Sequence, residues 1–227
     1  MPNVEIIQTR DGSSSLYLPD MDETYHSTHG AVTEALYVFL DKGLKCYRQL
    51  HPDHNVIKIL EVGFGTGLNA WLTAIAALED EVSIQYTTLE KFPIDRATID
   101  QLNYTQDRSV RDSGLFGAIH EADWNGQVDI HERFSVQKIY VDVFDFVSQQ
   151  ESFNIIFFDA FAPSKQPEMW SPEVLTKMYQ CLTNGGVLTT YCAQGQFKRD
   201  LKAVGFDTES LPGPPGKKEM TRGIKPS

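Results

Sequence analysis

A chain of 227 residues, 41% of them hydrophobic and 22% charged, is long enough for one α/β domain with a full core and a small elaboration. The net charge of −11 argues against nucleic-acid binding over the whole surface, because contacts to phosphate supply most of that affinity. The charge is uneven: residues 198–227 carry seven Lys and Arg against four Asp and Glu, which fits either a solvated tail or a functional basic patch.

Targeting and metal signals are lacking in the sequence. The N-terminus has no basic and apolar secretory signal, and no apolar run approaches the ~20 residues of a membrane span. Cys46, Cys181 and Cys192 are widely spaced in apolar settings, as expected for reduced cysteines of a cytoplasmic protein. His51 and His54 have no carboxylate or cysteine partners nearby, so we expect no metal.

The predicted elements begin with an N-terminal extension over residues 1–50, which contains a helix from about Gly30 to Leu44 and packs on a core formed by residues 51–227. In the core we expect strands at 56–60, 82–90, 153–158 and 187–191, a strand pair or long hairpin at 128–134 and 136–141, and two further strands in the tail. We expect helices at 68–78, 145–150, 172–182 and 194–204, and short helical or irregular pieces at 97–102 and 110–116. This βαβ succession predicts a doubly wound, mostly parallel Rossmann-like sheet.

Residues 59–69 combine the end of a buried strand, a loop with three alternating glycines and the start of a helix. Such a loop brings backbone N–H groups and a helix N-terminus close to a ligand. Leu68 stands where a dinucleotide fingerprint needs its third glycine, and Glu61 precedes the loop, which favours a ligand with a cationic amino-acid end. The pattern resembles the S-adenosylmethionine (AdoMet) loop of class I methyltransferases, although another nucleotide-binding fold or a plain tight turn also uses such glycines. The three glycines are Gly63, Gly65 and Gly67.

Carboxylates end four successive predicted strands, at the edge where an open α/β sheet binds its ligand. They are Glu61, Glu90, Asp142 and Asp159. Glu90 is placed to accept two hydrogen bonds from ribose hydroxyls, and Asp142 to accept the exocyclic amine of an adenine. Each carboxylate alone can be a helix cap or a satisfied turn residue. The four together, with the glycines, predict a site for a ligand shaped like adenosine joined to methionine.

The segment 159–170, Asp-Ala-Phe-Ala-Pro-Ser-Lys-Gln-Pro-Glu-Met-Trp, is the most specific motif of the chain. With the motifs at 25–27, 61–69, 89–93 and 213–220, it resembles the methyltransferase domain of the bacterial tRNA-modifying MnmC family and its stand-alone MnmD relatives. The resemblance covers roughly residues 20–225. It implies a class I AdoMet-methyltransferase fold with a seven-stranded sheet, AdoMet as cofactor, and the anticodon loop of tRNA as partner. The implied reaction is methylation of the aminomethyl group on C5 of the wobble uridine.

Two departures from the family pattern stand out. Bifunctional members carry a C-terminal flavin-dependent oxidase, whereas this sequence has no second glycine fingerprint after the methyltransferase motifs. We therefore expect the methyltransferase activity alone, on tRNA that already bears the aminomethyl group. Lys217-Lys218 also stands where bifunctional members often have Arg-Lys. The planar guanidinium group of arginine is thus replaced by the compact ammonium group of lysine.

The resemblance and the motifs together predict the site residues. Those expected at the cofactor are Tyr25, Glu61, Gly63, Phe64, Gly65, Gly67, Asn69, Glu90, Lys91, Asp142 and Asp159. Those expected at the substrate are Phe161, Pro163, Lys165, Trp170, Lys217, Lys218 and Arg222, with the three tail cations meeting phosphates of the anticodon loop. The role of Tyr25, closing over the methionine end, rests on the resemblance alone.

Asp159 and Phe161 are the expected catalytic residues. Methyl transfer to an amine needs collinear approach of nitrogen, methyl and sulfur, and Asp159 can orient the amine by accepting its N–H bonds. An ordinary Asp, with a pKa of about 3.9, would be a weak general base toward an alkylammonium. Phe161 and Trp170 can stack on a base, although core packing explains Trp170 equally well.

Two other classes of function stay open at this point. One is a different enzyme on a similar sheet, either a nicotinamide oxidoreductase or an aminopropyl transferase. The missing third glycine and the presence of Asp142 count against the oxidoreductase. The other is a non-catalytic AdoMet-binding or RNA-binding module, which would have no need for an acid such as Asp159 facing the methyl group.

Overall fold

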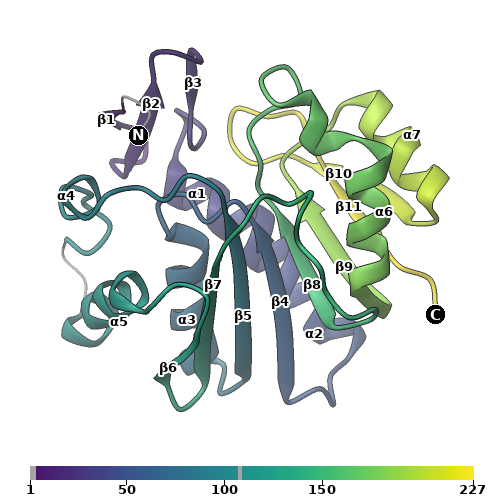
Figure 1. Ribbon diagram of the computed structural model, residues 1–227, viewed down its shortest axis with the longest axis horizontal. Helices are drawn as coiled ribbons and strands as arrows, with labels where there is room; N and C mark the ends of the chain where they lie inside the picture. Colours follow the sequence, from purple (N-terminus) through teal and green to yellow (C-terminus); the bar gives the residue numbers. More distant parts are fainter. Residues whose placement is uncertain (1–3, 107–108) are drawn as a thin grey trace.

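The computed structural model describes residues 4–106 and 109–227 and shows a central sheet with helices on both faces (Figure 1). Over these residues the sheet has eight strands, in the order β10-β11-β9-β8-β4-β5-β7-β6. The parallel centre consists of β9 (Leu182–Thr190), β8 (Phe153–Phe158), β4 (Val56–Val62), β5 (Ser83–Glu90) and β7 (Phe134–Tyr140). Antiparallel strands complete the two edges: β10 (Asp207–Pro212) and β11 (Glu219–Ile224) beside β9, and β6 (Gln127–His131) beside β7.

The predicted doubly wound, mostly parallel α/β class is confirmed. The sheet exceeds the expected seven strands because β6 joins β7 as an antiparallel hairpin, at the place where the sequence predicted a strand pair. Five parallel strands therefore end at one edge of the sheet, and the loops that follow them build the cavity described below.

Two apolar clusters, one on each face, make up the core. Ile59 of β4 and Phe157 of β8 lie in the first cluster, against the helices α3 (Leu68–Glu79) and α5 (Val110–Glu121). Their neighbours Leu60 and Phe158 point to the opposite face and pack with α6 (Pro172–Cys181) and α7 (Gly195–Val204). Because both faces of β8 are buried, its residues 155–158 form a continuous apolar run instead of alternating with polar residues.

The N-terminal fifty residues contain one element that the sequence analysis missed. An antiparallel sheet of β1 (Glu5–Gln8), β2 (Ser14–Leu18) and β3 (Glu23–Thr24) precedes the helices. The helix predicted from Gly30 to Leu44 runs on to Leu50, as α1 (Ala31–Ala35), a π-helical segment η1 (Leu36–Lys45) and α2 (Cys46–Leu50). Phe39 of η1 packs on Phe157 of β8, with ring centroids 5.2 Å apart. The division at residue 50 into extension and core stays a prediction.

Two other element predictions were wrong. Residues 145–150 form no helix. Strand β9 begins at Leu182 and passes through the glycines predicted to stop a helix, with Gly185 at φ +73° where the pairing with β8 shifts register. The remaining short helices are α4 (Arg96–Ile99) and the 3₁₀ turn η2 (Pro167–Trp170).

Three findings concern membrane-spanning helices, metal ligands and cysteines. Among the described residues, none of the helices combines the length and the apolar character needed to cross a membrane. The same part of the chain contains no group of three or more His, Cys, Asp and Glu arranged to hold a metal ion. Cys46, Cys181 and Cys192 are buried free thiols.

Candidate active site

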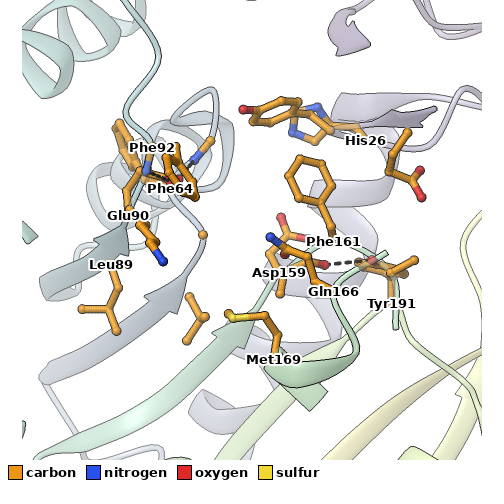
Figure 2. A pocket seen from close by; sticks show the side chains of 18 of the residues that line it. His26, Phe64, Leu89, Glu90, Phe92, Asp159, Phe161, Gln166, Met169 and Tyr191 are labelled. Atoms are coloured by element: carbon orange, nitrogen blue, oxygen red, sulfur yellow. Dashed lines mark hydrogen bonds between the residues drawn. The ribbon is translucent and has the colours of Figure 1, made fainter. Parts of the chain in front are cut away.

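The loops after β4, β5, β7, β8 and β9 surround a cavity of about 1000 Å³. Figure 2 shows Phe64, Leu89, Glu90 and Phe92 on one side of it, and Asp159, Phe161, Gln166 and Tyr191 on the other. We call these sides the Glu90 end and the Asp159 end. Segments far apart in the sequence close the Asp159 end, because Tyr25 and Glu34 from the N-terminal residues line the same cavity as Lys217 from the tail.

The glycine loop forms the wall between the two ends, and its glycines are required by close contacts. Gly63 has φ +94°, and a Cβ there would lie 2.7 Å from the backbone oxygen of Asp159. Gly65 has φ +50°, and a Cβ there would lie 3.1 Å from the ring of Tyr25. Any larger residue would therefore strain the backbone and separate the ends of β4 and β8. Gly67, also expected at the cofactor, does not line the cavity and instead caps helix α3.

Half-buried, hydrogen-bonded carboxylates characterise the Glu90 end. The Glu90 carboxylate accepts hydrogen bonds from the backbone N–H groups of Gly65 at 3.0 Å and Phe92 at 2.7 Å. Asp142 accepts from Lys91 Nζ at 2.6 Å and from the N–H of Phe144 at 3.1 Å. Burial is the largest single influence on Asp142 and opposes its charge, but the hydrogen bonds from Lys91 and Phe144 and the positive charges of Lys91 and Lys177 together outweigh burial and lower the pKa of this carboxyl. Lys91, Glu90 and Asp142 all line the cavity, where the sequence predicted them.

A buried cluster lies behind the Asp159 end. Asp159 lines the cavity, and its Oδ2 accepts a hydrogen bond from Asn69 Nδ2 at 2.8 Å. Burial, reinforced by the negative charge of Glu34, raises the pKa of Asp159 to about 7. The carboxyl that the sequence suggested to be a weak base is therefore poised near neutrality, and tertiary packing causes this shift.

Glu61 lies beneath the cavity instead of lining it. Its side chain is fully buried, and Oε2 accepts a hydrogen bond from Thr88 Oγ1 at 2.7 Å. Burial raises the pKa of Glu61 to about 8 despite that bond, so the side chain is largely protonated at pH 7. Glu61 Oε1 and Asn69 Oδ1 are buried without a hydrogen-bond partner among the described residues. Such unpartnered atoms are uncommon in folded proteins and are frequent at functional sites.

Aromatic rings cover the Asp159 end. The ring of Phe161 meets that of Tyr25 edge to face, with centroids 5.1 Å apart. The hydroxyl of Tyr191 donates to the backbone oxygen of Ala160 at 2.8 Å, which holds its ring beside Asp159. Phe161 and Tyr25 therefore both lie at the cavity, and so does Tyr191, which was not among the predicted residues.

Several predicted substrate residues lie away from the cavity. Trp170 is buried between Phe158 and Phe197 and donates from Nε1 to the backbone oxygen of Phe161 at 2.8 Å. This placement favours the core-packing alternative for Trp170 over base stacking, since its ring faces are already covered. The others outside the cavity lining are Pro163, Lys165, which donates to the backbone oxygen of Met21, Lys218, which is exposed, and Arg222, which pairs with Glu209.

Glu34 and Lys217 form an ion pair inside the Asp159 end, with 2.5 Å between Lys217 Nζ and Glu34 Oε2. From the sequence, Lys217 was expected to contact phosphate, and Glu34 was not among the predicted residues. No sequence signal relates the two residues, which stand 183 positions apart. His26, which also lines the cavity, was quoted only as part of a motif, and burial lowers its pKa to about 4.

Comparison with known proteins connects this site to a family. The sequence model of a family described as S-adenosyl-L-methionine-dependent methyltransferase matches residues 118–226. Two curated relatives are the tRNA 5-methylaminomethyl-2-thiouridine biosynthesis bifunctional proteins MnmC of Pseudoalteromonas atlantica, 29% identical over 221 residues, and of Idiomarina loihiensis, 30% identical over 214 residues. These alignments cover 90% and 89% of this chain, which spans about a third of the relatives, 31% and 35% of their lengths.

Solved structures share the fold. MnmC2 from Aquifex aeolicus is similar over 100% of this chain and 73% of its own, with a TM-score of 0.81 and 23% identity. Spermidine synthase from Thermotoga maritima is similar over 99% of this chain and 69% of its own, with a TM-score of 0.57 and 14% identity. The family model, the curated relatives and the fold together confirm the resemblance of this chain to the methyltransferase domain of the MnmC family and imply S-adenosyl-L-methionine as its cofactor.

Proposed function

We propose that this chain is an AdoMet-dependent N-methyltransferase that acts on the aminomethyl group at C5 of the tRNA wobble uridine. The observation that carries the proposal is Asp159: a carboxyl with a pKa of about 7 faces the cavity at the end of β8, within a segment that resembles MnmC. Such a carboxyl can both bind an ammonium group and accept its proton near neutral pH. The proposed location is the cytoplasm, where a tRNA substrate is found.

The residues of the cavity fit AdoMet. Each of the two Glu90 oxygens accepts one backbone N–H group and keeps a second lone pair, with which it would accept a hydrogen bond from a ribose hydroxyl. Asp142, at the same end, offers acceptors to an adenine amine, and Leu89 and Val143 supply apolar walls. The glycine loop leaves room for the methionine part between the ends, and the unpartnered Asn69 Oδ1 beneath it is a ready acceptor.

The proposed chemistry occurs at the Asp159 end. When bound, AdoMet supplies a methyl group on a positively charged sulfur. Asp159 first binds the substrate as an ammonium group and accepts one of its protons. AdoMet held between the two ends of the cavity would supply its methyl group to the nitrogen lone pair that Asp159 has freed, and the electron pair of its carbon–sulfur bond would stay on sulfur. The product is a secondary ammonium group beside a protonated Asp159, which later releases its proton to water.

Binding of tRNA must overcome the acidity of the protein. With a net charge of −11, most of the surface repels RNA, so we expect modest affinity that depends on inserting the wobble base into the cavity. Phe161 lines the cavity and offers an aromatic face to that base. The exposed Lys218, at the end of the turn that carries Lys217, is the proposed contact to anticodon-loop phosphate.

The test is methylation of tRNA that carries the aminomethyl group. Purified protein, this tRNA and AdoMet should yield methylaminomethyl-uridine, detected by mass spectrometry of the digested nucleosides. The same protein should bind AdoMet in the micromolar range by calorimetry and bind NAD far more weakly. Because a spermidine synthase shares the fold, decarboxylated AdoMet with a polyamine acceptor is the comparison reaction. Transfer to the polyamine without transfer to tRNA would overturn the proposal.

A further inference from the structure

Several contacts hold the ion pair between Glu34 and Lys217 at the Asp159 end of the cavity. Glu34 is only 7% exposed, and its second oxygen, Oε1, accepts the backbone N–H of Ser27 at 3.1 Å. Lys217 Nζ also lies 3.8 Å from the centroid of the Tyr191 ring, a cation–π distance. A pair of a buried carboxylate and a half-buried lysine contributes little to stability compared with apolar residues of similar size, so its presence suggests another role.

Backbone hydrogen bonds also fix the position of Lys217. The turn between β10 and β11 is closed by hydrogen bonds from Lys217 N to Pro214 O at 2.9 Å and from Gly213 N to Lys218 O at 3.1 Å. A Cβ on Gly213 would lie 2.5 Å from the backbone oxygen of Lys217, so the turn needs glycine there. Helix α1 and the tail turn, from opposite ends of the chain, thus deliver one negative and one positive charge to the same wall.

We propose that Glu34 and Lys217 are positioning residues for the reaction at Asp159, with opposite effects: Glu34 makes Asp159 a better proton acceptor, and Lys217 holds Glu34 in place while limiting that effect. This inference rests on the proposed function. It assigns Lys217 to the interior of the acceptor site instead of to a phosphate of the anticodon loop.

The charges around Asp159 support this assignment. The groups facing it from the surrounding elements are Asn69 of α3, Glu61 of β4, Tyr86 of β5, Tyr191 after β9, Glu34 of α1 and Lys217 of the β10–β11 turn. Burial raises the pKa values of Glu61 and of both tyrosines, which leaves these side chains mainly neutral at pH 7. Within this set, Glu34 and Lys217 are therefore the charged neighbours. After burial, Glu34 raises the pKa of Asp159 most, whereas Asn69 and Lys217 lower it.

Two opposing requirements on Asp159 explain why it needs a charged neighbour. Asp159 must be ionised to bind an ammonium group, yet basic enough to take a proton from it. A neighbouring carboxylate raises its proton affinity, because two like charges in one cavity repel each other. Lys217 compensates the charge of the Glu34 carboxylate and holds it at this wall of the cavity.

The experiment is a pH titration of the Asp159 carboxyl by ¹³C NMR in the parent protein, in Glu34→Gln and in Glu34→Gln/Lys217→Met. In Glu34→Gln, the pKa of Asp159 should fall, because the repelling carboxylate is gone and Lys217 is left unpaired. In the double variant it should lie between those of Glu34→Gln and the parent. The acid limb of the kcat/KM profile for tRNA methylation should move down by on the order of one pH unit in Glu34→Gln.

Two further variants separate this effect from loss of structure. Lys217→Arg keeps the ion pair and should leave the titration of Asp159 close to that of the parent. Glu209→Gln removes an ion pair of the same hairpin, that with Arg222 at 2.6 Å, outside the cavity, and should change neither titration nor profile. If Asp159 titrates identically in the parent and in folded Glu34→Gln, the pair is purely structural and the inference is wrong. The titration needs no turnover, so it stays informative even if the parent fails to methylate tRNA.

Discussion

The two ends of the cavity differ in how the chain builds them. At the Glu90 end, Glu90 and Asp142 stand at or just after the ends of β5 and β7 and accept hydrogen bonds from nearby backbone N–H groups, and Lys91 pairs with Asp142. At the Asp159 end, the functional groups come from residues as distant as Glu34 and Lys217, and burial shifts Asp159 and Glu61 toward their neutral forms. We infer that the first end binds and the second end reacts, since reactive groups need shifted pKa values and binding groups do not.

The largest expected effect lies at the reacting end. Asp159→Asn keeps the size of the side chain and the neighbouring Asn69 but removes the proton acceptor. We expect the methylation rate at saturating AdoMet and tRNA to fall about 10²- to 10⁴-fold, the usual contribution of a general base. AdoMet affinity, measured by calorimetry, should change much less. A variant that turns over at close to the parent rate would remove Asp159 from the mechanism.

A smaller effect, on binding instead of rate, is expected at the other end. Glu90→Ala removes both carboxylate oxygens that we assign to the ribose, and a hydrogen bond to a charged group contributes about 1.5–3 kcal/mol. The dissociation constant for AdoMet should therefore rise by roughly 10- to 100-fold, while the rate at saturating AdoMet falls less than in Asp159→Asn. Equal AdoMet affinity in Glu90→Ala and the parent would show that the comparison between the two ends is mistaken.

The sequence predicts cavity residues best where the residues of a motif are local along the chain. The glycine loop and the carboxylates at strand ends are set by a few consecutive residues, and the sheet brings the ends of its parallel strands to one edge whatever the remaining residues are. Glu90, Asp142 and Asp159 could therefore be placed from sequence. The same reasoning put Glu61 at the ligand, whereas its side chain points into the layer beneath, next to Thr88.

What the sequence could not predict depends on tertiary packing. The shifted pKa of Asp159 requires knowledge of which residues bury it, and the partner of Lys217 lies 183 positions away. The predicted helix at 145–150 failed for a similar reason. Lys177 Nζ from α6 donates hydrogen bonds to the backbone oxygens of Val143 and Phe144 at 2.9 and 2.6 Å, which holds the residues just before 145 in a turn. Val147 is 90% exposed, so a helix there would have little apolar surface to bury.

The smallest expected effect separates two adjacent lysines. Lys217 points into the cavity and pairs with Glu34, whereas Lys218 is exposed at the surface of the same turn. If Lys218 meets a phosphate, Lys218→Ala should reduce the salt slope of tRNA binding by about 0.7–0.9, the value for one lost contact. AdoMet affinity and the rate at saturating tRNA should stay unchanged, because Lys218 does not line the cavity.

The matched control for this last prediction is Lys58→Ala, which removes an exposed lysine near the start of β4, at the opposite edge of the sheet from the cavity. Both variants change the net charge equally, so a general electrostatic effect would appear in both. A reduced salt slope in Lys218→Ala alone would locate the RNA-binding face beside the cavity entrance. Equal slopes in the two variants and the parent would mean that Lys218 is merely solvated and that tRNA docks elsewhere. In that case the short tail turn would serve the reacting end alone, through Lys217.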